Sequence, residues 1–279
     1  MKHIFLNLKR FDIPVELGGV NRLSPVGEWG ANIVHRSEGG LSGYDPRQVE
    51  FVDFFPEAHI LGAAQARGEH SPIRLGCQGV FRADTSVRGN FGAFTTNRPA
   101  HAAAALGCEW TLIGHCEERN DKAGVLAEAG VSYTAAVNRI LNAEIKAAQA
   151  AGLRVLYCVG ETEAEQPCWQ QVLGEALSIG LDDVDLSKIV IAYEPIWSIG
   201  PGKTPADRPY IEKIARFLKK GTGDVDVVYG GGLKADNAAM LASIPEVDGG
   251  LIALTRFSGE IGFYPEEYLE IIRLYMEEI

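Results

Sequence analysis

Short apolar runs recur along the 279-residue chain, and longer segments with the period of an α-helix separate most of them. Each run is too short and too uniformly apolar to be a surface helix, so we expect each to form a buried β-strand. The expected strands are Ile4–Asn7, Val49–Phe55, Ile73–Cys77, Trp110–Gly114, Val155–Val159, Ile189–Tyr193, Val225–Tyr229 and Gly250–Leu254.

Segments with helical character lie between these runs and after the last one. Alternating strands and helices predict parallel strands joined by right-handed crossovers. Eight such units in a chain of this length favour an α/β fold of the closed (β/α)₈ barrel type, forming one domain over residues 1–279. An open, doubly wound sheet would give a similar alternation. The expected helices include Pro99–Leu106, Tyr133–Ala150, Cys168–Ile179, Pro209–Lys219, Ala235–Ala242 and Pro265–Ile279.

One stretch, Asp12–Pro46, interrupts this alternation between the first and second strands. It is long and rich in Gly and Pro, so we expect an irregular insertion over about residues 12–46. A loop that follows a barrel strand lies at the catalytic end of the barrel. The insertion therefore either shapes the active site or decorates the outside of the barrel.

Charge and hydropathy exclude several kinds of partner. The net charge of −11 argues against nucleic acid and anionic membrane, because both repel an acidic surface. An anionic metabolite can still bind through local N–H groups and a few cations. The N-terminus turns polar too soon for a signal peptide, and no apolar run approaches the roughly 18 residues of a membrane span. We therefore expect a cytoplasmic protein.

The chain contains five cysteines, and no two of them form a Cys-x-x-Cys pair. This pattern fits a reducing compartment better than a disulfide framework or a zinc site, so we expect no metal. Gly230-Gly231-Gly232 after a strand is a weak match to a dinucleotide-binding loop, since the third glycine and the ribose-binding context are missing. We therefore expect no cofactor.

Glu194 ends the apolar run Ile191–Tyr193 and precedes a loop punctuated by Gly and Pro. A glutamate at the carboxyl end of a barrel strand points into the mouth of the barrel, where a base is useful. The loop that follows combines apolar side chains with hinges, so it can close over a ligand and exclude water. On local reasoning alone, Glu194 could equally be a cap or a salt-bridge partner at the strand end.

The segment Tyr193–Thr204 resembles the base-and-lid signature of the triosephosphate isomerase family. Three further segments resemble that family in the same chain order, namely Asn7-Leu8-Lys9, Leu112–Arg119 and Tyr157–Thr162. The resemblance covers nearly the whole chain apart from residues 12–46 and 258–262. It implies a single TIM-barrel domain with a lid that includes Pro195, Ile196, Trp197, Lys203 and Thr204.

The resemblance also implies a role for each residue of the motifs. Glu194 would take a proton from the carbon next to a carbonyl and return it to the neighbouring carbon. His115 would polarise the carbonyl, Lys9 would face the developing oxyanion, and Asn7 would donate a hydrogen bond. Preorganised charge of this kind is usually the largest catalytic term. Glu117 would support the site, because it can help to open a helix just after His115, which in this family holds the histidine neutral.

A loop over Asn90–Thr95 resembles the dimer loop of the family. The resemblance implies a homodimer in which Thr95 reaches into the active site of the neighbouring subunit. The Gly-Glu pair that follows in the family is replaced here by Thr96 and Asn97. The alternative is an ordinary surface turn that contains glycine.

The phosphate-binding loops depart from the family pattern. Gly200 is retained, but Gly232 replaces a serine, and Ala253 and Leu254 replace two glycines. Glycine allows close approach to an oxyanion and a positive φ, which leucine does not readily adopt. The phosphate cradle is therefore altered. Arg256 could compensate for lost donors, or it could face solvent or pair with Glu260.

The lid latch is also altered. The family's latch tyrosine is retained as Tyr229, but the lid position that it would bond is Pro205, which has no N–H. The serine partner is missing at Gly232. We therefore expect the lid to close less firmly, or through other partners.

Three functional hypotheses remain. The first is a triosephosphate isomerase that interconverts glyceraldehyde 3-phosphate and dihydroxyacetone phosphate, binding a small sugar phosphate. The second is a cofactor-free aldose–ketose isomerase for another sugar, a tetrose or pentose phosphate or an unphosphorylated sugar, which the altered cradle and the insertion favour. The third is a catalytically silent barrel that binds a metabolite or a protein. The joint presence of Asn7, Lys9, His115 and Glu194 argues against silence.

Overall fold

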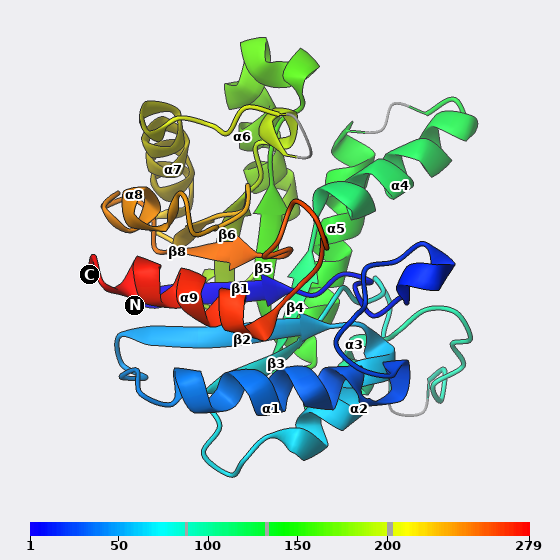
Figure 1. Cartoon of the computed structure of the whole chain (residues 1–279). Coiled ribbons are helices and arrows are strands. Elements are labelled where there is room, and N and C mark those ends of the chain that lie inside the picture. Colours follow the sequence, from blue (N-terminus) through cyan, green and yellow to red (C-terminus); the bar gives the residue numbers. More distant parts are fainter. Residues whose placement is uncertain (87–88, 132–133, 200–202) are drawn as a thin grey trace.

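The computed structural model describes residues 1–86, 89–131, 134–199 and 203–279. It is a closed barrel of eight parallel strands in chain order (Figure 1). The first and last strands pair with each other, with His3 opposite Gly249. The predicted barrel is confirmed, and the open-sheet alternative was wrong. The strands are β1 (Lys2–Asn7), β2 (Val49–Phe55), β3 (Ile73–Cys77), β4 (Trp110–Ile113), β5 (Arg154–Val159), β6 (Ile189–Tyr193), β7 (Val227–Tyr229) and β8 (Gly249–Ile252).

Helices surround the barrel, and both chain ends lie opposite the arrowheads of the strands (Figure 1). In α7 the buried residues Ile211, Ile214, Ala215 and Leu218 recur every three or four positions, which places them on one face against the barrel. The α-helices are α1 (Trp29–Leu41), α2 (Glu57–Ala66), α3 (Ala100–Ala105), α4 (Cys116–Glu128), α5 (Thr134–Ala150), α6 (Trp169–Gly180), α7 (Arg208–Thr222), α8 (Ala238–Ala242) and α9 (Pro265–Met276). Short 3₁₀ helices are η1 (Val15–Leu17), η2 (Val26–Glu28), η3 (Glu163–Cys168), η4 (Leu186–Lys188) and η5 (Ile196–Ser198).

The barrel interior is filled by side chains from alternate strand positions. Phe5 of β1 packs edge-on against Trp110 of β4, with ring centroids 5.2 Å apart, and stacks against Phe54 of β2. A Cβ at Gly76 of β3 would lie 2.3 Å from the Phe54 ring, so only glycine fits beside this ring. The interior is therefore a packed core rather than a channel.

The stretch Asp12–Pro46 is not irregular throughout, because α1 occupies Trp29–Leu41. The prediction was wrong there because three glycines and several polar residues obscure the helical period. The buried face is still amphipathic, with Ile33, Val34 and Leu41 against the barrel. Residues 12–28 do form an irregular lobe, with two short 3₁₀ turns, at the arrowhead end of the strands (Figure 1).

The lobe of residues 12–28 lies against the loop that follows β8. Arg22 donates a hydrogen bond from Nη1 to the carbonyl oxygen of Ile261 at 3.1 Å. The β8 loop folds back on itself through a bridge between Arg256 and Gly262. This fold-back explains why β8 ends at Ile252 rather than at the predicted Leu254. Two segments unusual for the family thus meet at the mouth of the barrel.

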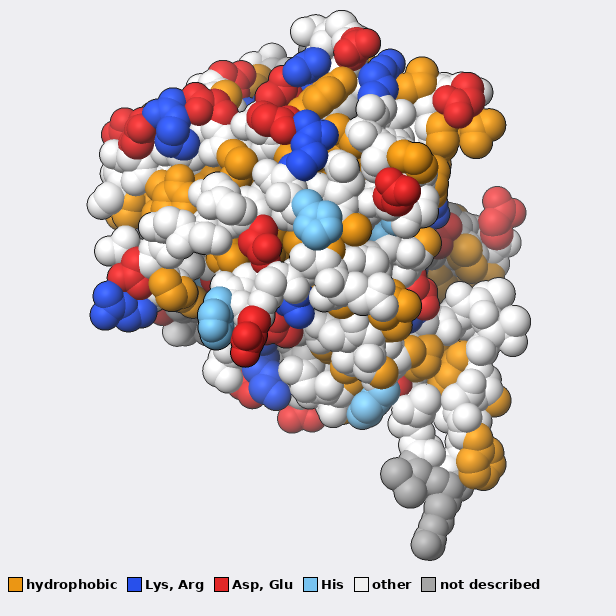
Figure 2. Space-filling view, turned by 60° about the horizontal axis from the view of Figure 1, so that its bottom comes forward, with side chains coloured by type: hydrophobic (Ala, Val, Ile, Leu, Met, Phe, Trp, Pro, Cys, Tyr) orange, Lys and Arg blue, Asp and Glu red, His pale blue; other side chains and the backbone are white. Residues whose placement is uncertain are grey.

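The surface carries mixed charge. Figure 2 shows acidic, basic and apolar side chains interspersed on one face, without a continuous basic area on that face. The net charge of −11 gives an average field that repels a polyanion. Within the described parts of the chain, every helix is too short or too polar to cross a membrane.

Candidate active site

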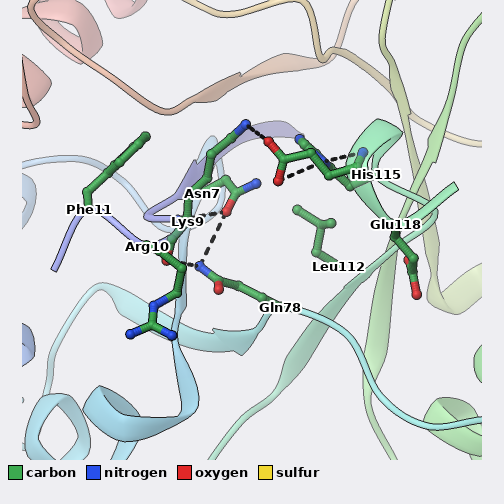
Figure 3. Close-up of a pocket in the computed structure, with 9 residues that line it drawn as sticks. Asn7, Lys9, Arg10, Phe11, Gln78, Leu112, His115 and Glu118 are labelled. Carbon is green, nitrogen blue, oxygen red and sulfur yellow. Dashed lines mark hydrogen bonds and ion pairs between the residues drawn. The ribbon is translucent and has the colours of Figure 1, made fainter. Parts of the chain in front are cut away.

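Asn7, Lys9, His115 and Glu194 meet at the mouth of the barrel, as the sequence predicts. They lie at or just after the carboxyl ends of β1, β4 and β6, and these ends share one face of a parallel barrel. His115 Nε2 is 3.4 Å from Glu194 Oε1. A cavity of about 430 Å³ opens beside them (Figure 3). Its walls are formed by Asn7, Lys9, Arg10, Phe11, Gln78, Leu112, His115, Glu117 and Glu118.

His115 is the N-cap residue of α4, which confirms the helix predicted to begin after it. Its Nδ1 accepts a hydrogen bond from the backbone N–H of Glu117 at 3.3 Å. An imidazole whose Nδ1 accepts is neutral and carries its proton on Nε2. The Nε2–H therefore faces Glu194 and the cavity, where it can donate to an oxygen of a ligand.

Glu194 is buried, with 2% of its surface exposed. Oε2 accepts a hydrogen bond from the backbone N–H of Cys116 at 2.9 Å, whereas Oε1 has no hydrogen-bond partner among the described residues. Burial raises the pKa of Glu194, although His115 and the N–H of Cys116 favour its charged form. A carboxylate with a raised pKa is a stronger base than an ordinary glutamate, which suits proton abstraction from carbon.

Lys9 is held in a strained backbone conformation. Its φ of 41° lies in the left-handed region, which is uncommon for a residue other than glycine and often marks a functional site. Its N–H donates to Asn7 Oδ1 at 3.1 Å, and its ammonium donates to Glu117 Oε1 at 2.7 Å. Burial tends to raise the pKa of Glu117, but Lys9 holds it below the ordinary value. The supporting role expected for Glu117 thus includes fixing the ammonium.

Gln78 is a site residue that the sequence analysis did not identify. It follows β3 directly, and its Nε2 donates to the carbonyl oxygen of Lys9 at 3.0 Å (Figure 3). The same Nε2 donates to the carbonyl oxygen of Phe54 at 3.1 Å. The same amide approaches Asn7 Oδ1 at 3.4 Å. In the sequence, only its position just past a strand end indicated that Gln78 could be a site residue.

Glu161 is a second such residue. Its buried carboxylate accepts three hydrogen bonds at Oε1, from Tyr193 Oη at 2.9 Å, Trp197 Nε1 at 2.8 Å and Tyr210 Oη at 3.0 Å. Trp197 belongs to the predicted lid, so Glu161 ties the start of the lid to β5 and α7. The family-like segment Tyr157–Thr162 contained this residue, but its sequence does not reveal the partners.

The predicted lid residues fall into two groups. Pro195 caps η5, and Ile196 and Trp197 lie within η5, directly after Glu194. Lys203 and Thr204 are exposed on the far side of the loop, and the Lys203 ammonium lies 3.7 Å from Glu163. Gly200, the retained glycine, lies outside the described residues.

The altered phosphate loops have their own geometry. Gly232 has a φ of 101°, so this position favours glycine where the family has serine. Ala253 and Leu254 are partly exposed, and neither has a positive φ. The backbone here therefore does not need the glycines that these two residues replace. Whether this backbone binds phosphate stays a prediction.

Arg256 is engaged by other side chains. Its guanidinium pairs with Glu267 of α9 through Nε at 2.8 Å and lies 3.8 Å from the centroid of the Tyr264 ring. The acidic partner of Arg256 is thus on α9.

Lys234, two residues after Gly232, lies over the ring of Phe257 at 4.3 Å. Its ammonium has no ion-pair partner among the described residues.

Thr95 and its neighbours lie away from the site on this subunit. Thr95 is exposed, and Phe91 near the tip of the same loop is 89% exposed with a φ of 55°. Phe91 is thus a large apolar side chain that the described residues of this chain leave uncovered. The loop is therefore available to a partner.

The described residues include one group able to hold a metal ion, which is His115, Cys116 and Glu194. Cys116 is partly buried, and its Sγ lies 3.7 Å from His115 Nδ1. Burial and the nearby Glu194 raise the pKa of the Cys116 thiol to about 12. The thiol is therefore protonated in the absence of a metal.

Fold and site together define a (β/α)₈ barrel with a carboxylate, an imidazole and an ammonium at one mouth. The family model "Triosephosphate isomerase" matches residues 35–273. The chain belongs to the triosephosphate isomerase family.

Curated relatives agree with this assignment. The chain is 33% identical over 249 residues to the triosephosphate isomerase of Marinobacter nauticus, covering 85% of this chain and 87% of that protein. It is 38% identical over 175 residues to the triosephosphate isomerase of Pelodictyon phaeoclathratiforme, covering 58% of this chain and 64% of that protein. The crystal structure of triosephosphate isomerase from Bartonella henselae shares the fold, with a TM-score of 0.71 and 24% identity over 99% of both chains.

Proposed function

We propose that this chain interconverts glyceraldehyde 3-phosphate and dihydroxyacetone phosphate. The observation that carries the proposal is the approach of His115 Nε2 to Glu194 Oε1 at 3.4 Å, with the Lys9 ammonium at the same cavity. These three groups supply a base, a neutral hydrogen-bond donor and a positive charge, which proton transfer next to a carbonyl requires.

Each group has one task in the proposed reaction. Glu194 takes the proton from the carbon next to the carbonyl, and the electron pair moves to the carbonyl oxygen. His115 transfers its Nε2 proton to that oxygen, which gives the enediol, and then takes the proton of the neighbouring hydroxyl, which leaves the enediolate of the product. Lys9 and Asn7 stabilise the negative charge that develops on oxygen. Glu194 then returns its proton to the adjacent carbon, so the reaction needs no cofactor.

The family resemblance implies that the phosphate group of the substrate binds at the loops that carry Gly200, Gly232, Ala253 and Leu254. The positive φ of Gly232 supports close approach of its backbone to an oxyanion. Arg256 stays a proposed compensating cation, although it already pairs with Glu267. If Arg256→Ala changes neither substrate affinity nor turnover, this role is wrong.

A second candidate is an aldose–ketose isomerase for a larger or unphosphorylated sugar. Two observations favour it, namely the replaced glycines at Ala253 and Leu254 and the contact between the lobe of residues 12–28 and the β8 loop. Both lie where a barrel determines its substrate.

One assay separates these candidates. Triose, tetrose and pentose phosphates, with their unphosphorylated counterparts, are incubated with the enzyme in D₂O, and deuterium incorporation at carbon is followed by NMR. We expect the triose phosphates to exchange fastest and Glu194→Gln to abolish the exchange. Faster exchange with a longer sugar would establish the second candidate. The absence of exchange with every sugar would indicate a silent barrel.

We also propose a homodimer formed through the loop Asn90–Thr95. The 89% exposure of Phe91 supports an apolar contact that this subunit does not provide itself. Analytical ultracentrifugation should show a dimer for the wild type and a shift towards monomer for Phe91→Ser. A monomeric wild type at micromolar concentration would contradict the proposal.

A further inference from the structure

The catalytic carboxylate and imidazole lie beside a thiol that the proposed reaction does not use. We propose that His115, Cys116 and Glu194 bind a divalent cation of the zinc type, and that the bound ion blocks the active site. The ion would be an inhibitor and would take no part in the isomerisation. Binding depends on the geometry of these side chains, whereas the inhibition also rests on the proposed function.

The three side chains have the spacing of a metal site. One ligand atom from each of His115, Cys116 and Glu194 can be chosen so that all lie within 4.8 Å of one another. His115 Nε2 and Glu194 Oε1 are 3.4 Å apart, close to the roughly 3.3 Å that separates two ligands in a tetrahedral zinc site. The thiol lies beside the same imidazole, with its Sγ 3.7 Å from His115 Nδ1.

Glu194 supplies an independent observation. Its carboxylate is 2% exposed, and Oε1 has no hydrogen-bond partner among the described residues. A buried charged oxygen that lacks a donor is unfavourable. The nearby ammonium of Lys9 already pairs with Glu117 at 2.7 Å. A cation between Glu194 and His115 would therefore satisfy an atom that the protein leaves unpaired.

The donor set selects the kind of ion. Nitrogen, sulfur and carboxylate oxygen together suit zinc and similar ions, whereas magnesium prefers an all-oxygen shell. Three protein ligands leave a fourth tetrahedral position free. His115 lines the 430 Å³ cavity, so water from the cavity can fill this position.

Binding of the ion changes the protonation of Cys116 and His115. Cys116 loses its thiol proton to the buffer when the bond between sulfur and metal forms. His115 shifts to the other tautomer, with its proton moving from Nε2 to Nδ1 through solvent. Two interactions with Nδ1 are given up, the hydrogen bond from Glu117 N–H at 3.3 Å and the contact with the Cys116 thiol at 3.7 Å. One proton is released per ion, and no group is oxidised or reduced.

Metal binding is tested with Co²⁺ as a spectroscopic substitute for Zn²⁺, on full-length enzyme freed of metal by EDTA. We expect one Co²⁺ per subunit with a thiolate-to-cobalt charge-transfer band that Zn²⁺ abolishes and Mg²⁺ does not. Cys116→Ser should remove this band and weaken binding at least tenfold. Cys168→Ser, which changes an exposed cysteine in η3, should behave like the wild type. Absence of the band in the wild type, or its persistence in Cys116→Ser, would overturn the proposal.

Inhibition is tested separately, in the deuterium-exchange assay. We expect Zn²⁺ to inhibit in competition with substrate, EDTA to reverse the inhibition, and Cys116→Ser to need at least tenfold more Zn²⁺. Full activity with the site saturated would refute the inhibitory role. If no sugar exchanges at all, the proposed function fails, while the Co²⁺ titration still decides whether the site exists.

Discussion

At the scale of single residues, we expect the proposed base Glu194 to act through its position. Its carboxylate is fixed by the N–H of Cys116 at 2.9 Å and faces His115 at 3.4 Å. Glu194→Asp withdraws the carboxylate by about 1 Å, a displacement that typically costs on the order of 100-fold in rate. We expect kcat to fall by about this factor, with a much smaller change in KM, in steady-state assays. A raised KM with an unchanged kcat would show that Glu194 acts mainly in binding.

Gln78 acts at the same scale through Lys9. Gln78→Leu removes the donor to the carbonyls of Lys9 and Phe54, and each buried acceptor left unpaired costs about 1–3 kcal/mol. The strained backbone of Lys9 should relax, so we expect kcat/KM to fall by about tenfold and the melting temperature to decrease. Gln171→Leu, which removes an exposed contact to Glu175, is the matched control and should change neither quantity. Unchanged kinetics of Gln78→Leu would limit Gln78 to a role in stability.

At the scale of elements, Asp53 links β2 to α9 through a hydrogen bond from Tyr268 Oη at 3.3 Å. Burial raises the pKa of Asp53 to about 7, so the folded state favours the protonated carboxyl. The associated stability is complete below the ordinary pKa near 4 and is lost as the pH rises through about 7. Asp53→Asn should therefore stabilise the protein at pH 8, by an amount on the order of 4 kcal/mol at most, with little gain at pH 4.

Urea unfolding of the wild type and Asp53→Asn at both pH values measures this difference. Tyr268→Phe is the control for the hydrogen bond, because it keeps the buried carboxyl and removes its partner. A gain of equal size at pH 4 and pH 8 would show that ionisation of Asp53 does not limit stability.

The elements differ in how well the sequence predicts them. The bounds of β2, β3 and β6 agree with the predicted runs, because strands with apolar residues on both faces stand out from their surroundings. The helix α1 was missed because Gly30, Gly39 and Gly40 weaken its pattern, although packing against the barrel stabilises it. Local propensity therefore fails where tertiary contacts determine the structure.

The site residues also differ in how well the sequence predicts them. Positions at strand ends predicted that Glu194 and His115 would meet, while their roles came from the family resemblance. The contacts of Gln78 and Glu161 join side chains from several elements, and no local pattern encodes such pairs. The ion pair between Arg256 and Glu267 could not be predicted for the same reason, because Glu267 lies on α9, a different element.

At the scale of the whole molecule, a buried ionic network closes the barrel at the end opposite the active site. His3 of β1 bonds Glu50 of β2 and Asp226 beside β7, each at 2.7 Å, and Arg154 of β5 bonds Glu50 at 3.0 Å. One small cluster thus joins four of the segments that enclose the barrel. Its strength should influence the unfolding of the entire molecule, because parting these strands opens the barrel.

The pH dependence of this network follows from its ionisable groups. Burial disfavours the charged form of His3, but the bonds to Asp226 and Glu50 outweigh it and raise the pKa of His3 above 6.5. The pKa values of Glu50 and Asp226 are lowered. The contribution of His3 to stability is complete below pH 6.5 and is lost as the pH rises through its folded pKa. The carboxylates lose their contribution to stability in acid, as the pH falls through their lowered folded pKa values. The network is therefore strongest between about pH 4.5 and 6.5.

His3→Gln keeps a polar side chain at this position but cannot carry the charge. We expect it to destabilise the protein most near pH 5.5, by about 1–3 kcal/mol, because Glu50 and Asp226 lose their bonds to a charged imidazole. Glu50 keeps Arg154 as a cationic partner, and Asp226 is partly exposed, so the loss is smaller than for an unpaired buried charge. The loss should shrink towards pH 9, where the wild-type histidine has also lost its charge. Thermal unfolding of both proteins from pH 5 to pH 9 measures the difference. A loss that is the same at every pH would mean that His3 contributes through packing and neutral hydrogen bonds, and that the barrel base is not held together by charge.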